Sequence, residues 1–174
     1  SVNDNPDDAK QRVQHAIDGL NQAIRDLRSY ILDLRPRQLG SDGLMAGIKR
    51  LSAEYRANTF ADVHITEPES DLIDLPQGHV LTLFHICQEA LANTAKHARA
   101  KKVQIAVWAT DERVLMEIND DGKGFDIDSM NENIGHGLAN MRTRARSIGG
   151  DVDISSAPNE GTTVLAWVPR DIRP

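Results

Sequence analysis

The sequence predicts an α/β protein, a two-layer sandwich of helices and a mostly antiparallel sheet, preceded by a long N-terminal helix. Helical patterns alternate along the chain with segments whose apolar residues recur at every second position. Ahead of them, residues 13–34 carry the heptad repeat of a coiled coil or helical bundle. We therefore expect a helical segment and linker in residues 1–40 and a globular domain in residues 41–174.

The N-terminal helix is predicted from an apolar seam with alternating spacings of four and three residues. The seam consists of Val13, Ile17, Leu20, Ile24, Leu27, Ile31 and Leu34. Isoleucine at the a positions and leucine at the d positions favours two-stranded coiled coils, and four-helix bundles use the same seam. Pro36 is expected to end this helix.

The elements of the globular part follow in order after residue 43. Helices are predicted at 43–58, from Pro76 to about Ala98, and from about Leu138 to Ile148, where Gly149-Gly150 stops the last one. Strands are predicted in "ADVHITEP", "KVQIAVWAT" and "RVLMEINDDGKG", the last of which ends in a glycine-rich loop. "DVDISSAPNEGTTVLAWVP" is typical of a hairpin around "APNEG".

Composition excludes several classes of protein. The chain has 174 residues, 40% apolar and 26% charged, which fits a compact domain with an appendage and excludes disordered and collagen-like chains. No apolar run approaches the roughly 20 residues of a membrane-spanning helix. The net charge of -6 argues against a nucleic-acid partner. The single cysteine, Cys87, fits a reducing, cytoplasmic setting.

The helix after Pro76 has two distinct faces. An apolar stripe, expected to face the sheet, consists of Val80, Phe84, Cys87, Leu91 and Ala95. A second face carries His85, Glu89, Asn93, Lys96 and His97. This polar face is either a solvated surface or a site for a hard cation and phosphate, with an amide oxygen for Mg²⁺ and cationic groups for phosphate. Spacing alone leaves both interpretations open.

Glycine-rich stretches form the next candidates. In "DDGKGF", Asp120 stands at a strand end, and Gly122 and Gly124 permit a flat ligand to approach the backbone. A buried carboxylate there can accept a hydrogen bond from an exocyclic amino group such as that of adenine. An ordinary turn is the alternative interpretation.

Two further stretches extend this pattern. In "GHGLANM", Gly135 and Gly137 precede the predicted helix start at Leu138, where free N–H groups favour anions. The polar residues 125–134 have the composition of a mobile lid. In "NEGTTV", Thr162 offers a hydroxyl to a ligand, although a hairpin turn explains the stretch equally well.

The ordered set "QEALANTAKHA", "DDGKGF", "GHGLANM" and "EGTTV" resembles the N, G1, G2 and G3 boxes of the ATP-binding domain of sensor histidine kinases. These belong to the superfamily that includes gyrase, Hsp90 and MutL. The resemblance spans about residues 43–169 and implies a Bergerat-type sandwich that holds ATP between the long helix and the lid. "IRDLRSYILDLRPRQLGSDGL" looks like the second dimerisation helix of kinases (HisKA_3 type) that partner LuxR/NarL-type response regulators.

The resemblance implies a role for each matching residue. Asn93 would coordinate the Mg²⁺ that bridges the phosphates, and Asp120 would receive the adenine amino group. Glu89 is expected to be important for catalysis, without being assigned as the general base. The other residues expected to contact ATP are Lys96, His97, Gly122, Gly124, Gly135, Gly137, Leu138 and Thr162.

The implied reaction is phosphoryl transfer from ATP to a histidine, followed by relay to an aspartate of a response regulator. The subfamily's phosphoacceptor is a histidine followed by an acidic residue, and no such pair occurs in this chain. His15 precedes Ala16 at an outer heptad position, which is typical of a solvated helix surface. We expect the acceptor histidine to lie on a preceding helix of the parent protein. That protein is expected to be a homodimer. Any contact with a membrane is expected to involve only regions outside this chain.

Two other classes of function stay open. One is the nucleotide-binding module of a degenerate kinase, which tight ATP binding without transfer to a supplied acceptor helix would identify. The other is an ATPase of the gyrase or Hsp90 kind, which steady ATP hydrolysis would identify. The heptad helix and the "LRP" stretch favour the kinase.

Overall fold

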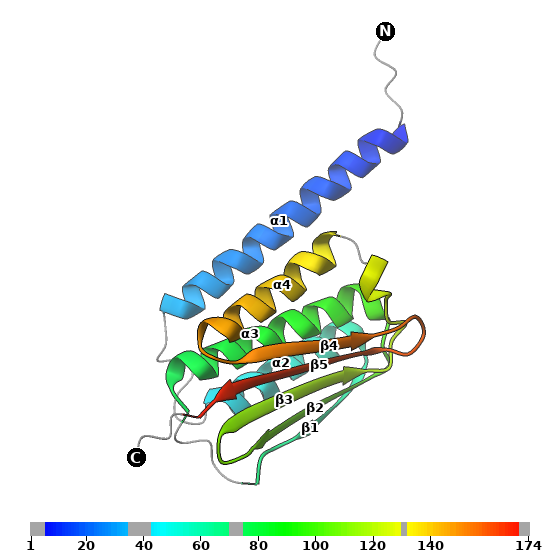
Figure 1. Ribbon diagram of the computed structural model, residues 1–174. Helices are drawn as coiled ribbons and strands as arrows, with labels where there is room; N and C mark the ends of the chain where they lie inside the picture. The colour runs from blue at the N-terminus through cyan, green and yellow to red at the C-terminus, as the bar shows by residue number, and fades with distance from the viewer. Residues whose placement is uncertain (1–5, 35–42, 70–74, 130–131, 171–174) are drawn as a thin grey trace. The chain divides into compact units, whose positions relative to one another are not determined.

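The structure is a computed structural model that describes residues 6–34, 43–69, 75–129 and 132–170. The chain forms two compact units, Ser1–Gln38 and Leu39–Pro174. The first unit contains helix α1 (Pro6–Leu34). The second contains three α-helices and a five-stranded sheet among its described residues, which confirms the predicted fold class (Figure 1).

Helix α1 agrees with the helix predicted from the heptad seam. The first seam residues are exposed, Val13 by 60%, Ile17 by 44%, Leu20 by 64% and Ile24 by 44%. The side chains of the later seam residues, and Pro36, lie outside the described residues. Nowhere in the described ranges is there a helix both long and apolar enough to cross a membrane. These four side chains form an apolar strip on the surface of α1.

The sheet of the second unit has the strand order β1-β2-β3-β5-β4. Its strands are β1 (Asp62–Thr66), β2 (Lys102–Ala109), β3 (Arg113–Asp120), β4 (Asp151–Ser156) and β5 (Thr162–Pro169). β1 pairs with β2 in parallel, and every other pairing is antiparallel. β3 is therefore the central strand, and its last residue is Asp120.

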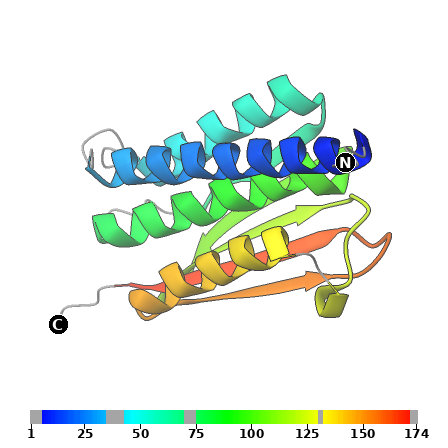
Figure 2. The same cartoon turned by 90° about the horizontal axis from the view of Figure 1, so that it is seen from above.

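Three helices cover one face of this sheet (Figures 1 and 2). They are α2 (Gly43–Thr59), α3 (Gln77–Asn93) and α4 (Glu132–Ser147). Alternate residues of β2, β3, β4 and β5 point to this face and are buried, among them Val103 and Ile105 of β2 and Met116 of β3. The helices meet them with Leu83 and Ile86 of α3. This apolar layer between helices and sheet is the core of the unit.

The apolar stripe of α3 is confirmed at its three central members. Phe84, Cys87 and Leu91 are buried, whereas Val80 is half-buried and Ala95 is exposed. The helix changes from α to π hydrogen bonding at η2 (Thr94–Ala98). Thr94 and Ala98 lie three and seven residues after Leu91, so helical periodicity places them on the buried side. Thr94 and Ala98 are buried instead.

The predicted start of the last helix was wrong. α4 begins at Glu132 rather than near Leu138, so Gly135 and Gly137 lie inside the helix. Glycine costs an α-helix only about 1 kcal/mol relative to alanine, which tertiary packing can outweigh. Gly137 shows this packing, since a Cβ there would lie 2.5 Å from Oε1 of Glu89 on α3. Within the predicted lid, residues 127–129 form a short 3-10 helix, η3 (Ile127–Ser129).

Substituting Gly161 by alanine should destabilise the domain. Gly161 has φ +73°, and an added Cβ would collide with the backbone oxygen of Asp120. We expect Gly161→Ala to lower the free energy of unfolding by about 2 kcal/mol, measured by urea denaturation. Gly135→Ala is the matched control, because nothing lies within 4 Å of its Cβ position and the helix favours alanine. Equal losses of unfolding free energy in the two variants would contradict the steric requirement for glycine at position 161.

Candidate functional site

A pocket opens where the end of β3 meets α3, η2, α4 and the start of β5. The space between its walls amounts to about 480 Å³ when the adjoining open solvent is included. Its lining residues are Ala90, Asn93, Thr94, His97, Ala98, Ile118, Asp120, Gly124, Phe125, Leu138, Thr162 and Val164. The lining draws on all four motifs singled out in the sequence, which are far apart along the chain.

The central polar group of the pocket is the carboxylate of Asp120. This side chain is only 4% exposed. Its Oδ1 accepts a hydrogen bond from the Gly122 amide at 2.9 Å, and its Oδ2 lies 3.2 Å from the hydroxyl of Thr94. Burial raises the pKa of Asp120, while hydrogen bonds from Gly122, Thr94 and Thr162 act in the opposite direction. The pocket thus presents the Asp120 carboxylate, a hydrogen-bond acceptor, among mainly apolar lining residues.

Gly122 and Gly124 are required by the protein's own packing. A Cβ on Gly122 would collide with Ala98 of η2 and lie 2.8 Å from Oδ1 of Asp120. Gly124 has φ +59°, and a Cβ there would collide with the backbone oxygen of Ala157. These contacts pull the loop after β3 against η2 and the β4–β5 hairpin. The role of the two glycines in admitting a flat ligand stays a prediction.

The polar face of α3 and η2 is only partly solvated. His85 is 4% exposed and packs edge-on against Phe84, with 5.7 Å between ring centroids. Glu89, Asn93 and His97 are half-buried, and only Lys96 is exposed. Asn93 and His97 line the pocket, whereas Glu89 and Lys96 do not. The burial of these side chains excludes a purely solvated outer face.

Gly135 and Gly137 occupy different environments on α4. Gly137 is buried against α3, since a Cβ on it would lie 2.5 Å from Oε1 of Glu89 and 3.6 Å from Nδ2 of Asn93. Nothing lies within 4 Å of the Cβ position of Gly135. The G2-like stretch therefore packs directly on the N-like stretch through Gly137. Neither glycine lines the pocket, although Leu138 does.

Thr162 belongs to a hydrogen-bonded group that joins the lid to the hairpin. The Ser156 hydroxyl lies 2.9 Å from the Thr162 hydroxyl. It donates a hydrogen bond to the Gly161 backbone oxygen at 3.0 Å and accepts one from the Phe125 backbone amide at 2.9 Å. The first residue of the predicted lid is thereby tied to the β4–β5 hairpin.

Several lining residues were not singled out in the sequence. Ile118 and Val164 carry a usable signal, because the alternation of their strands predicts that both face inward. Thr94 also carries a helical signal, because it follows Cys87 by seven residues and Leu91 by three and so falls on the buried side of the helix. The sequence alone could not have placed its hydroxyl beside Asp120.

The described residues contain no group of three or more His, Cys, Asp or Glu side chains that could hold a metal ion. A single amide oxygen such as that of Asn93 still suits Mg²⁺, because this ion is commonly held by one or two protein ligands together with phosphate oxygens. Zinc would require more nitrogen or sulfur ligands. The residues present therefore fit Mg²⁺ carried by a nucleotide.

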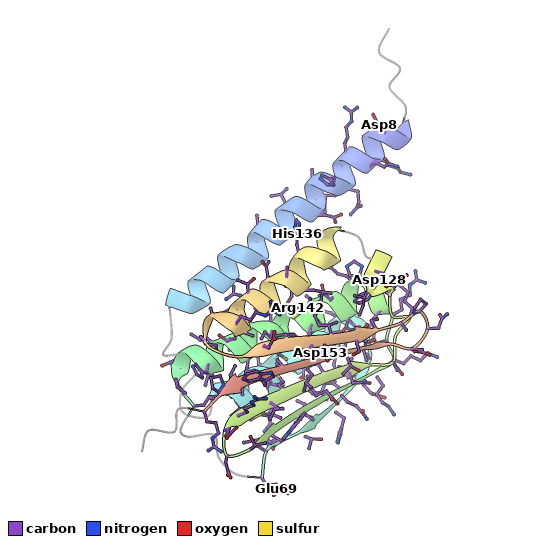
Figure 3. The ribbon with its side chains drawn as sticks, in the orientation of Figure 1. Asp8, Glu69, Asp128, His136, Arg142 and Asp153 are labelled. Carbon is purple, nitrogen blue, oxygen red and sulfur yellow. The ribbon has the colours of Figure 1, made fainter. Side chains whose placement is uncertain are left out.

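Arg142 of α4 lies over the edge of the sheet (Figure 3). Its Nε donates to the backbone oxygen of Val152 on β4 at 3.4 Å. This contact directs the guanidinium towards β4. The stretch of α4 after Met141 thus helps to attach the helix to the sheet, and the pocket is bounded by the earlier part of α4 around Leu138.

The burial of Asp120 predicts a characteristic dependence of stability on pH. The raised pKa means that the folded chain holds this proton more tightly than the unfolded chain, whose value is near 3.8. The stability it contributes is complete below that value and is lost as the pH rises through the folded pKa. Asp120→Asn should therefore gain stability relative to wild type as the pH rises above 3.8, measured by urea unfolding.

Asp121→Asn is the matched control for this prediction. The Lys102 amide, followed by that of Lys101, lowers the pKa of Asp121. Its contribution to stability is present above the unfolded value and lost on acidification, so the sign of the pH dependence should be opposite. Parallel pH profiles for the two variants would contradict the burial argument.

Residues 78–172 match the family model described as histidine kinase-, DNA gyrase B-, and HSP90-like ATPase. The chain is 34% identical over 172 residues to sensor histidine kinase MctS of Rhizobium johnstonii, covering 97% of this chain and 37% of MctS. It is 35% identical over 165 residues to sensor protein VraS of Staphylococcus saprophyticus, covering 92% and 46%. It is 30% identical over 168 residues to sensor histidine kinase LiaS of Bacillus subtilis, covering 97% and 46%.

The chain thus spans less than half the length of these relatives. Among solved structures, the blue-light activated histidine kinase of Erythrobacter litoralis EL346 superimposes with a TM-score of 0.58 at 21% identity, covering 70% of this chain and 40% of that chain. This likeness supports the fold. The family model covers more than half of the chain and includes nearly all of α3, the central strand β3 and the pocket. The chain therefore belongs to the family of histidine kinase-, DNA gyrase B- and Hsp90-like ATPases, and its domain is homologous to the catalytic ATP-binding domains of sensor histidine kinases.

Proposed function

We propose that this chain is the ATP-binding catalytic part of a two-component sensor histidine kinase, which binds Mg-ATP and transfers the γ-phosphoryl group to a histidine outside the chain. The observation that carries the proposal is the buried Asp120 carboxylate in an apolar pocket that also contains Asn93. Family membership implies ATP binding. The relatives named as sensor histidine kinases support phosphoryl transfer to histidine.

The inner part of the pocket suits an adenine base. Ile118, Leu138 and Val164 offer flat apolar surface to the ring. The ionised Asp120 carboxylate is an acceptor only, so it selects a ligand that presents a donor, such as the exocyclic amino group of adenine. Thr162 lies at the same end and supports the base. A base without that amino group would leave the buried carboxylate without its partner, which costs affinity.

The outer part of the pocket suits phosphate. ATP supplies the phosphoryl group, and Mg²⁺ neutralises the charge that develops on its oxygens. Asn93 offers an amide oxygen to the ion, while His97, which lines the pocket, and Lys96 on the next turn bring donors to phosphate. Gly135 and Gly137 can offer their amides to phosphate only if the start of α4 unwinds, because amides inside a helix donate to carbonyls four residues earlier. The two glycines are thus the hinge of the lid.

Glu89 is proposed to contribute to catalysis at the phosphate end of the pocket, without being assigned as the general base. It is half-buried, and its Oε1 lies against Gly137 at the beginning of α4. The surroundings of this carboxylate therefore depend on whether α4 is packed on α3. Its contribution to phosphoryl transfer would therefore come through the lid as well as through charge.

The N-terminal residues 1–40 are proposed to be the second helix of the dimerisation domain and its linker, and residues 41–174 the catalytic domain. The exposed seam of α1 supports this division, since an apolar helix face requires a partner helix. The parent protein would be a homodimer of the HisKA_3 type that relays phosphate to a LuxR/NarL-type response regulator. The "LRP" stretch supports the HisKA_3 and LuxR/NarL assignment, and the sensor kinases among the relatives support dimerisation and a response-regulator partner in general.

Asp120→Asn should abolish most ATP binding. The substitution replaces an acceptor-only carboxylate with an amide that can turn an NH₂ group towards the base. We expect calorimetric titration to show an affinity loss of about 10- to 100-fold, with and without Mg²⁺. Asp111→Asn removes a carboxylate from the exposed turn at the opposite end of β3 and should bind ATP like wild type. Failure of wild type to bind ATP would overturn the proposed function.

Asn93→Ala should remove mainly the Mg²⁺-dependent part of ATP affinity. In our proposal the Asn93 amide oxygen binds the Mg²⁺ ion and does not contact the adenine base. Binding of the base at Asp120 should therefore be undisturbed. Titrations with Mg²⁺ and with excess chelator separate the two contributions. Asn58→Ala on the exposed surface of α2 is the control. An equal loss in both conditions would show that Asn93 acts on the nucleotide rather than on the ion.

A further inference from the structure

Thr94 is a buried polar residue next to the pocket's carboxylate. It is 5% exposed and directly follows Asn93 at the start of the π turn η2. Its hydroxyl lies 3.0 Å from the backbone oxygen of Ala90 and 3.2 Å from Oδ2 of Asp120. Both neighbours are acceptors, while a threonine hydroxyl has one proton to donate. The destination of that proton decides what Thr94 does.

The carbonyl of Ala90 does not depend on this hydroxyl. The backbone N–H of Thr94 already donates to the Ala90 oxygen. Oδ2 of Asp120 belongs to a buried carboxylate, which attracts a hydroxyl proton more strongly than a neutral carbonyl does. A buried carboxylate oxygen without donors is also costly. The hydroxyl proton is therefore shared towards Asp120 whenever that group is ionised.

This contact fixes the direction in which the carboxylate faces. Oδ1 is held by the Gly122 amide at 2.9 Å, and Oδ2 is held by Thr94. With one donor on each oxygen, the plane of the carboxylate can no longer rotate freely about its bond to Cβ. An ionised carboxylate has about four acceptor sites, so it retains capacity for a ligand. That capacity lies at the pocket, which Asp120 lines.

The elements that carry the two residues are themselves held together. The Lys123 amide donates to the Ala98 oxygen at 2.7 Å, which joins the loop after β3 to η2. Gly122 approaches Ala98 so closely that no Cβ would fit between them. The distance from Thr94 to Asp120 is therefore set by the framework. A donor at this point is preorganised and costs no rearrangement when a ligand binds.

We propose that Thr94 is a positioning residue for base recognition, whose hydroxyl holds the Asp120 carboxylate in the orientation that accepts the exocyclic amino group of adenine. The inference rests on the proposed function, because it requires Asp120 to recognise that group. Thr94 does not touch the base in this scheme. Its effect on binding is transmitted through Asp120 alone.

The test compares ATP with purine riboside 5′-triphosphate, which lacks the exocyclic amino group, in calorimetric titrations of the whole chain. Thr94→Val removes the hydroxyl and keeps the branched shape, and Thr94→Ser keeps the hydroxyl. Wild type should prefer ATP. Thr94→Val should lose about tenfold in ATP affinity with little change for the analogue, so the preference falls. Thr94→Ser should retain it.

Thr82→Val is the matched control. Thr82 is buried on the same helix, and its hydroxyl makes the same bond to a carbonyl four residues earlier, with Gly78 at 2.9 Å. It lies near the opposite end of α3 from the pocket, so its substitution should leave the preference for ATP intact. If valine crowds the Thr94 site and unfolds the chain, Thr94→Ala serves as the hydroxyl-free variant.

The outcomes separate the two proposals. A hydroxyl-free variant that keeps the full preference for ATP, or loses equal affinity for both nucleotides, overturns the positioning role and leaves the proposed function standing. A wild type that binds both nucleotides equally overturns recognition of the amino group by Asp120, and the positioning role with it. A wild type that binds neither overturns the proposed function itself.

Discussion

The arrangement of this domain depends on burying one carboxylate at the end of its central strand. Asp120 is 4% exposed and lies where β3 leaves the sheet. A buried carboxylate must be surrounded by donors, and the chain supplies them from the backbone at Gly122 and from the hydroxyl of Thr94. The close backbone approaches at Gly122 and Gly161 follow from the same requirement, because side chains there would displace the loop and hairpin that enclose the carboxylate.

Burying this carboxylate is costly for stability. Burial raises the pKa of Asp120, so an ionised carboxylate at neutral pH is a liability for folding. The surrounding core of β2, β3 and α3 is large enough to tolerate it. Such local conflicts with folding rules are typical of binding sites, where a desolvated polar group gains its value from the ligand.

The helix that faces the carboxylate has to serve both the core and the site. Over α3, Phe84, Cys87 and Leu91 complete the core. At η2 the hydrogen bonding changes to π, Thr94 and Ala98 are buried, and Asn93 and His97 line the pocket. One continuous helical segment thus carries an apolar face into a polar site.

The sequence by itself determined the kinds of elements, most of their boundaries and the order of the four motifs. Alternation along β2 and β3 and the helical stripe of α3 are local patterns, and they report which side of an element is buried. They do not report which atoms of another element lie opposite. For that reason the strand order, the π turn at η2, the start of α4 at Glu132 and the partnership of Thr94 with Asp120 were decided only by tertiary structure. Each depends on contacts between residues distant in sequence, whose packing outweighs local preferences such as the cost of about 1 kcal/mol for a helical glycine.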